Sequence, residues 1–157
     1  MVTTVNGRYA GDVLPEEAFE SLRGDVNAVL IDVRTRAEWG FVGVPDLASC
    51  NKAAVLVEWQ RYPTMEMNEA FVVDVETALG ELDSGDAEPD DSGANTERPL
   101  FFLCRSGVRS VAAAEAMTAA GYMKSFNVTE GFEGSLDVEG HRGVGGWKAR
   151  GLPWVQK

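Results

Sequence analysis

The chain has few of the residues that build metal sites and disulfide frameworks. Its 157 residues include two cysteines, Cys50 and Cys104, and a single histidine, His141. Two isolated cysteines give neither a disulfide framework nor a metal-ligand spacing, and one histidine argues against a zinc site and against a Cys-His-Asn protease. We therefore expect a protein that works without a metal ion and without a cofactor.

Long apolar runs and positive charge are also scarce. No apolar stretch approaches the roughly 18 residues of a membrane span, and residues 1–6 have neither the basic region nor the hydrophobic core of a signal peptide. Lysine and arginine number 14 against 25 acidic residues, which gives a formal net charge of −11. Binding to nucleic acid or to an anionic membrane needs clustered cations, so this charge argues against both partners. We expect a soluble, cytoplasmic protein.

What is present fits one globular domain over residues 1–157. Hydrophobic side chains make up 45% of the chain, enough for a sizeable core. The apolar pattern predicts helices at residues 14–22, 68–82 and 108–120, a short helical turn at 35–39, and strands at 28–33, 47–50, 100–103 and, last in the chain, 125–128. We expect Cys50 in the core. Strands that alternate with helices predict an α/β fold with parallel strands.

One segment breaks this pattern. Residues 84–97 are polar and acidic with almost no apolar side chain, and they include Gly85, Pro89 and Gly93. Such a composition cannot bury enough apolar surface to offset the entropy of ordering it. It predicts a mobile acidic loop at about 84–97 within one domain, rather than a boundary between two domains.

Cys104 is the most informative residue. It follows the apolar run 100–103 and precedes Arg105-Ser106-Gly107-Val108-Arg109-Ser110 and a helix of small residues. Parallel sheets bind ligands at the carboxyl ends of their strands, and a helix N-terminus there stabilises anions, including a thiolate. A glycine in the loop permits the positive φ of an anion-binding nest. The alternative is an ordinary buried cysteine, but two nearby arginines favour a reactive one.

Three segments, in this order along the chain, resemble the rhodanese (sulfurtransferase) family. They are Leu30-Ile31-Asp32-Val33-Arg34-Thr35-Arg36-Ala37-Glu38-Trp39, residues 101–110, and Gly145-Gly146-Trp147 with Gly151-Leu152-Pro153. The resemblance implies a five-stranded parallel sheet flanked by helices on both faces. It also implies a sulfurtransferase that moves a sulfane sulfur from thiosulfate or a persulfide donor to a thiophilic acceptor, a small molecule or a protein, through a persulfide of Cys104.

The same resemblance assigns roles by position. Cys104 would carry the sulfur, and Asp32 and Arg34 would support its loop from the neighbouring strand end. The loop itself would bind the substrate, through Arg105, Ser106, Gly107, Val108, Arg109 and Ser110. Simpler roles stay open, because Asp32 could bond the amides of the next turn and Arg34 could pair with Glu38. The loop arginines could also be solvated surface charge.

The chain departs from the family pattern in two places. Residues 41–48 lack the histidine that the family usually has after its second strand, and residues 135–144 form a longer segment than expected before Gly145. His141 lies in this longer segment. Although histidine suits proton transfer near neutral pH, we expect an exposed loop residue here.

Two other functions remain open. Cysteine-dependent phosphatases and arsenate reductases of related fold hold an oxyanion in a loop with five residues between cysteine and arginine. Here four residues separate Cys104 from Arg109, and no general acid for phosphoester hydrolysis is evident. The spacing therefore favours sulfur transfer. The other function is that of a non-catalytic rhodanese module for protein interaction, although such modules usually lose the cysteine.

Overall fold

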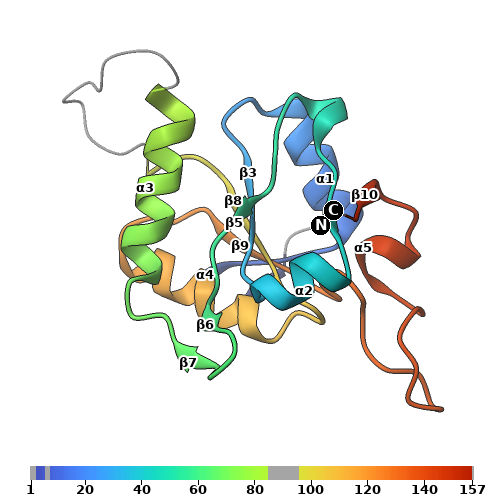
Figure 1. The fold of residues 1–157 in the computed structure, drawn as a ribbon. Coiled ribbons are helices and arrows are strands. Elements are labelled where there is room, and N and C mark those ends of the chain that lie inside the picture. Colours follow the sequence, from blue (N-terminus) through green and yellow to red (C-terminus); the bar gives the residue numbers. More distant parts are fainter. Residues whose placement is uncertain (1–2, 6–7, 85–95, 157) are drawn as a thin grey trace.

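The computed structural model describes residues 3–5, 8–84 and 96–156, and a six-stranded sheet forms its centre (Figure 1). In spatial order the strands are β1 (Thr3–Val5), β2 (Tyr9–Val13), β9 (Ser125–Val128), β8 (Leu100–Leu103), β3 (Val29–Asp32) and β5 (Val55–Leu56). The five strands from β2 to β5 run parallel, and β1 is antiparallel to β2. The expected five-stranded parallel sheet is confirmed, with one antiparallel strand added at its edge.

Helices cover both faces of the sheet, as expected. α3 (Phe71–Ser84) and α4 (Arg109–Ala119) pack on one face, and α1 (Pro15–Gly24) and α5 (Gly146–Ala149) pack on the other (Figure 1). The short helix α2 (Arg36–Phe41) follows β3. The predicted helices agree with α1, α3 and α4 to within a few residues. No helix in the described ranges is both long enough and apolar enough to cross a membrane.

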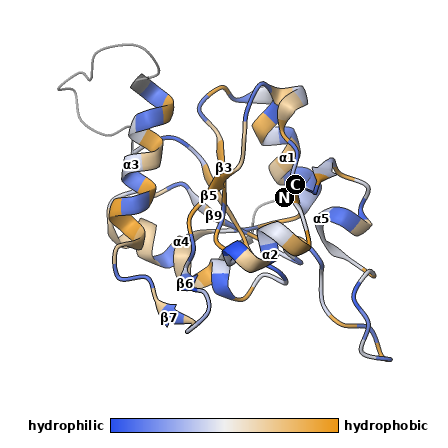
Figure 2. Cartoon of the chain, viewed as in Figure 1, coloured by the Kyte–Doolittle hydropathy of each residue, from blue (hydrophilic) through white to orange (hydrophobic). Residues whose placement is uncertain are grey.

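The two central strands, β3 and β8, are buried at every position, and apolar residues gather at β3 in the centre of the molecule (Figure 2). Successive side chains of a strand point to opposite faces of the sheet. Ile31 and Phe102 therefore join the core under α3 and α4, while Leu30 and Phe101 join the core under α1 and α5. Burial on both faces explains why these strands are continuous apolar runs in the sequence.

The strand expected at residues 47–50 is wrong. A turn of 3-10 helix, Ala48–Cys50, occupies this place, and the edge strand β5 comes several residues later. The Asp46 side chain accepts a hydrogen bond from the first N–H of the turn, and Asn51 ends it with a φ of 58°, which asparagine tolerates. Cys50 was also predicted wrongly, because it is half-buried and belongs to neither core.

In the described part of the chain, four short strands pair outside the main sheet. β4 (Val44–Pro45) pairs with β10 (Trp154–Val155), and β6 (Gln60–Arg61) pairs with β7 (Glu66–Met67), both antiparallel. The sequence pattern predicted none of these pairs, and β10 shows that the strand at 125–128 is not the last in the chain. Most of the acidic loop predicted at 84–97 falls on residues 85–95, which lie outside the described residues.

Candidate active site around Cys104

Cys104 lies immediately beyond the carboxyl end of β8, and it is only 1% exposed. The N–H of Gly107 donates to its Sγ over 3.1 Å, and Oγ of Ser110 lies 3.2 Å from the same sulfur. Gly107 lies in the loop that links β8 to α4, and Ser110 lies in the first turn of α4, both within the segment 105–110 that the sequence singled out. An N–H directed at a sulfur atom stabilises negative charge on it.

Two glycines shape the backbone around the sulfur. Gly107 turns the loop with a φ of 98°. The segment after β9 forms a second wall, in which the N–H of Phe132 donates to the carbonyl of Cys104 over 2.8 Å. Gly131 lets this wall come close, because a Cβ at its position would lie 2.6 Å from the carbonyl oxygen of Arg105. The loop is therefore held from the β9 side as well as by α4.

Asp32 and Arg34 form a fully buried ion pair beside this wall. Nε of Arg34 donates to Oδ1 of Asp32 over 2.9 Å, and Nη2 donates to Oδ2 over 2.6 Å. Nη2 also donates to the carbonyl of Gly43, and the guanidinium lies 4.2 Å from the ring centre of Phe132. Phe132 in turn donates its N–H to the carbonyl of Cys104, so the ion pair contacts a residue that is hydrogen-bonded to the loop.

Glu38 pairs with Arg109, so the alternative in which Glu38 pairs with Arg34 is wrong. The contact is bidentate, at 2.7 and 2.9 Å, and the two side chains are 20% and 19% exposed. Burial raises the pKa of Glu38, but the hydrogen bonds and charge of Arg109 outweigh it and hold the pKa below its usual value. Arg109 also interacts electrostatically with Cys104. In the sequence, the capping box of Thr35 and Glu38 could have placed Glu38 at the start of a helix, α2.

The other predicted loop residues face outward to different degrees. Arg105 and Val108 are exposed, and Ser106 is half-buried. Of the two arginines expected to bind an anionic donor, one is thus open to solvent and the other, Arg109, is paired. His141 is 71% exposed, as expected for a loop histidine. Within the described ranges, no group of three or more His, Cys, Asp and Glu side chains could hold a metal ion.

Sequence reasoning missed three residues behind Ser110. The Ser110 hydroxyl donates to Oδ1 of Asn127 over 2.5 Å, and Nδ2 of Asn127 donates to Oδ1 of Asp12 over 3.0 Å. The Tyr9 hydroxyl donates to the same Asp12 oxygen over 2.9 Å. We call Ser110, Asn127, Asp12 and Tyr9 the polar chain. In the sequence, Asn127 could have indicated the polar chain. It is a polar residue in the largely buried strand β9, and buried polar groups need hydrogen-bond partners.

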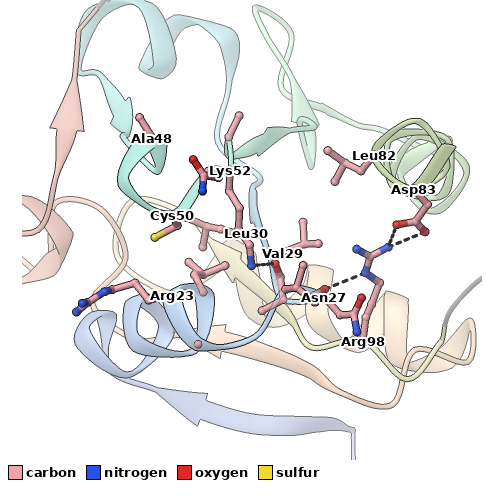
Figure 3. A pocket seen from close by; sticks show the side chains of 16 residues that line it. Arg23, Asn27, Val29, Leu30, Ala48, Cys50, Lys52, Leu82, Asp83 and Arg98 are labelled. Carbon is pink, nitrogen blue, oxygen red and sulfur yellow. Dashed lines mark hydrogen bonds and ion pairs between the residues drawn. The ribbon is translucent and has the colours of Figure 1, made fainter. Parts of the chain in front are cut away.

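A separate pocket of about 890 Å³ opens at the amino-terminal end of β3 (Figure 3). Because β3 and β8 are parallel and Cys104 follows the carboxyl end of β8, this pocket and the candidate active site lie at opposite ends of the sheet. The cations of the pocket already have partners. Nζ of Lys52 donates to the carbonyls of Asp25 and Ala28, each over 2.7 Å, and burial lowers the pKa of this amine. Arg98 pairs with Asp83 at 2.8 Å. Lys52 thus binds the segment that precedes β3, and Arg98 joins the segment that precedes β8 to α3.

Comparison with known proteins gives a consistent family. A family model described as the rhodanese-like domain matches residues 15–136. Two uncharacterized proteins, one from Rickettsia conorii and one from Rickettsia montanensis, are each 34% identical to this chain over 143 residues. Each match covers 91% of this chain and 95% of the relative.

Solved structures share the fold. Rv0390 from M. tuberculosis is 47% identical with a TM-score of 0.78, and the match covers 95% of this chain and 99% of that one. A polysulfide-sulfur transferase homodimer from Wolinella succinogenes is 19% identical with a TM-score of 0.50, covering 93% and 78%. A rhodanese-like domain protein from Staphylococcus aureus is 18% identical with a TM-score of 0.51, covering 93% and 97%. At identities this low, the last two show the fold alone.

Proposed function

This chain belongs to the rhodanese-like domain family, and we propose that it is a sulfurtransferase that moves a sulfane sulfur through a persulfide on Cys104. The donor is thiosulfate or a persulfide, and the acceptor is a thiophilic small molecule or protein. One observation carries the proposal: the N–H of Gly107 points at Sγ of Cys104 from 3.1 Å, in the loop that leads into α4. A sulfur atom with a fixed donor beside it suits a nucleophilic thiolate.

The proposed reaction has two steps. In the first, the Cys104 thiolate attacks the sulfane sulfur of the donor, a new S–S bond forms, and the bond from that sulfur to the rest of the donor breaks. With thiosulfate, sulfite leaves and takes the electron pair of the broken bond. In the second step, the acceptor attacks the outer sulfur, the persulfide S–S bond breaks, and the thiolate is regenerated.

The surrounding residues take complementary roles in this proposal. The backbone of residues 105–110 surrounds the transferred sulfur, and the exposed Arg105 attracts an anionic donor. Arg109 holds α2 against the loop through Glu38. The buried pair of Asp32 and Arg34 keeps the loop in place.

The phosphatase alternative fits this site less well. Holding a phosphoryl group calls for a guanidinium whose two donors face the oxyanion. Arg109 instead directs Nη1 and Nη2 at the Glu38 carboxylate, and the loop is one residue shorter than in those enzymes. A phosphatase assay with an aryl phosphate therefore serves as the companion to the sulfur-transfer assay.

The test is the intact mass of the protein after incubation with thiosulfate. We expect wild type to gain one sulfur atom, which cyanide removes as thiocyanate. Cys104→Ser should gain none, because a serine hydroxyl does not become an anionic nucleophile near neutral pH. Cys50→Ser is the matched control, since it removes the only other thiol, and it should gain sulfur like wild type. Loss of the gain in Cys50→Ser with retention in Cys104→Ser would refute the assignment.

A further inference from the structure

The polar chain connects the Cys104 sulfur to β2, two strands away across the sheet. It runs from Sγ to Ser110 over 3.2 Å, from Ser110 to Asn127 over 2.5 Å, and from Asn127 to Asp12 over 3.0 Å. Ser110 is 0% exposed and Asn127 is 3% exposed. Because both are buried, the direction of each hydrogen bond depends on its neighbours in the chain.

Asp12, at the far end of the polar chain, determines which group donates in each of these hydrogen bonds. An ionised Asp12 carboxylate can only accept, so the amide NH₂ of Asn127 must face it. Oδ1 of Asn127 then faces Ser110, and the Ser110 hydroxyl must give its single hydrogen to that oxygen. Burial, and then the hydrogen bond to Asp12, raises the pKa of Tyr9 to about 12, so Tyr9 stays a donor to Asp12 at neutral pH.

The consequence appears at the sulfur. With its hydrogen directed at Asn127, Ser110 presents a lone pair to Cys104. A neutral thiol fits this arrangement, because S–H donates to that lone pair while Sγ accepts from Gly107. A thiolate keeps the hydrogen bond from Gly107, but it faces the lone pair of Ser110 instead of a donor. Ser110 could donate to a thiolate only by turning its hydrogen away from Asn127, which would leave a buried amide oxygen without a donor.

We propose that Asn127 and Asp12 are positioning residues that hold the Ser110 hydroxyl in the orientation favouring the neutral thiol of Cys104. They thereby restrain the nucleophile of the resting protein. The biological sense of this restraint rests on the proposed function, in which Cys104 carries the sulfur. The restraint itself is a property of the free protein and is measurable without any sulfur donor.

The effect of charged groups near the thiol must be separated from that of the polar chain. On α4, Arg109 interacts electrostatically with Cys104, and Glu38 of α2 and Asp32 of β3 in turn act on Arg109. None of these three takes part in the hydrogen bonds of the polar chain. Their influence is the same in every variant that leaves them unchanged.

The charge of Asp12 itself needs a control. Removing a nearby negative charge favours a thiolate through space, whatever the hydrogen bonds do. Glu115 of α4 is the other carboxylate that acts on Tyr9. Glu115→Gln therefore removes a charge from the same neighbourhood and leaves the hydrogen bonds of the polar chain intact.

The experiment measures the rate at which iodoacetamide alkylates Cys104 as a function of pH, in the full chain with Cys50→Ser so that one thiol remains. Asp12→Asn keeps the size of the side chain but offers either end of an amide, so Asn127 can turn over and Ser110 can donate to the sulfur. We expect Asp12→Asn to move the midpoint of the curve of alkylation rate against pH about one pH unit lower. The rate below the midpoint rises about threefold, because the more acidic thiolate is also less nucleophilic. Glu115→Gln should move the midpoint by less than about 0.3 unit.

A double-mutant comparison decides the mechanism. Ser110→Ala removes the hydroxyl that connects the polar chain to Cys104. In this background, Asp12→Asn should no longer shift the pH dependence of the alkylation rate. An equal shift in both backgrounds would mean that charge acts through space, and it would overturn the proposal. Asn127→Leu, which also frees the Ser110 hydroxyl, is the second variant and should shift the profile in the same direction. A shift in a protein that never gains sulfur would leave this inference standing and refute only the sulfurtransferase proposal.

Discussion

At the scale of single residues, the ionic side chains around the thiol are mostly paired with one another. Asp32 is paired with Arg34, and Glu38 is paired with Arg109. Arg105 is exposed and can meet an incoming anion. A loop with one exposed arginine and one neutralised arginine attracts a dianion less than two free arginines would. The pairing of Arg109 therefore affects how strongly the loop attracts thiosulfate, which is a dianion.

Glu38→Gln tests this effect of the pairing. Glutamine can still complete the capping box with Thr35 at the start of α2, but it no longer neutralises Arg109. We expect kcat/KM for thiosulfate to rise about fivefold, which corresponds to roughly 1 kcal/mol and is the scale of a partly exposed ion pair. Thiocyanate release at several salt concentrations measures this, and the fall with salt should be steeper than in wild type because the freed charge is screened.

The matched control for this variant is Glu139→Gln. It removes the same charge from a side chain that is 76% exposed in the segment 135–144, and its kinetics should equal those of wild type. If Glu38→Gln shows wild-type kinetics at every salt concentration, Arg109 has no influence on an anionic donor.

At the scale of elements, the sequence predicted the central strands and the loop that follows β8, because local sequence determines both. β3 and β8 are buried on both faces, so each stands out as an apolar run. The loop residues 104–110 follow β8 without interruption, and the order strand, loop, helix was enough to place a thiol beside a helix N-terminus. These parts of the site needed no knowledge of how the chain folds back on itself.

The missed parts depend on the order of the strands in the sheet. β2 reads Tyr-Ala-Gly-Asp-Val, with Gly11 and Asp12 inside it, and it is a strand because β9 offers it a partner in register. Asn127 reaches Ser110 only because β9 lies beside β8. Glu38 likewise reaches Arg109 from a helix 71 residues away in sequence. These are tertiary contacts between residues far apart in the sequence, and no local sequence pattern predicts them.

Gly131→Ala tests how the segment after β9 holds the loop. Its φ of 63° is one that other residues adopt occasionally, so backbone strain alone predicts a small loss. A Cβ there, however, would lie 2.6 Å from the carbonyl carbon and oxygen of Arg105, and backbone atoms cannot move aside cheaply. We expect a loss of about 3 kcal/mol or more in the free energy of unfolding by urea titration, together with loss of persulfide formation.

Gly121→Ala is the control for this prediction. Its φ of 106° is less favourable for alanine than that of Gly131, but a Cβ at Gly121 would meet nothing within 4 Å. It should cost about 1–2 kcal/mol from backbone strain and leave persulfide formation unchanged. If Gly121→Ala proves the more damaging of the two, strain and not the close approach to the loop dominates.

At the scale of the whole molecule, a net charge of −11 coexists with ion pairs that join distant parts of the chain. Arg150, after α5, pairs with Glu130 beyond β9 and with Glu16 of α1. The hydrogen bonds from Arg150 lower the pKa of Glu130, and they prevail over burial, which raises it. Ion pairs thus join the C-terminal segment to the body, and the pair with Glu130 requires that this carboxylate stay ionised.

This arrangement predicts how stability depends on pH. Glu130 and Glu38 both have a folded pKa below the usual value, so the stability they contribute is present above the unfolded pKa of about 4.3 and is lost as pH falls through the folded pKa. Protonation of other, exposed carboxylates acts in the opposite sense, because it relieves repulsion in a chain of high negative charge. Comparison of variants separates the two effects.

Urea unfolding of wild type and Glu130→Gln at pH 7, 5, 4 and 3 makes that comparison. Glu130→Gln should be less stable than wild type at pH 7 and 5, because it lacks the ionised partner of Arg150, and the two curves should converge towards pH 3, where wild type has lost that partner through protonation. Glu139→Gln removes the same charge from an exposed site and should run parallel to wild type throughout. A constant difference between Glu130→Gln and wild type at all four pH values would mean that the charge of Glu130, and with it the ion pair to Arg150, does not stabilise the fold.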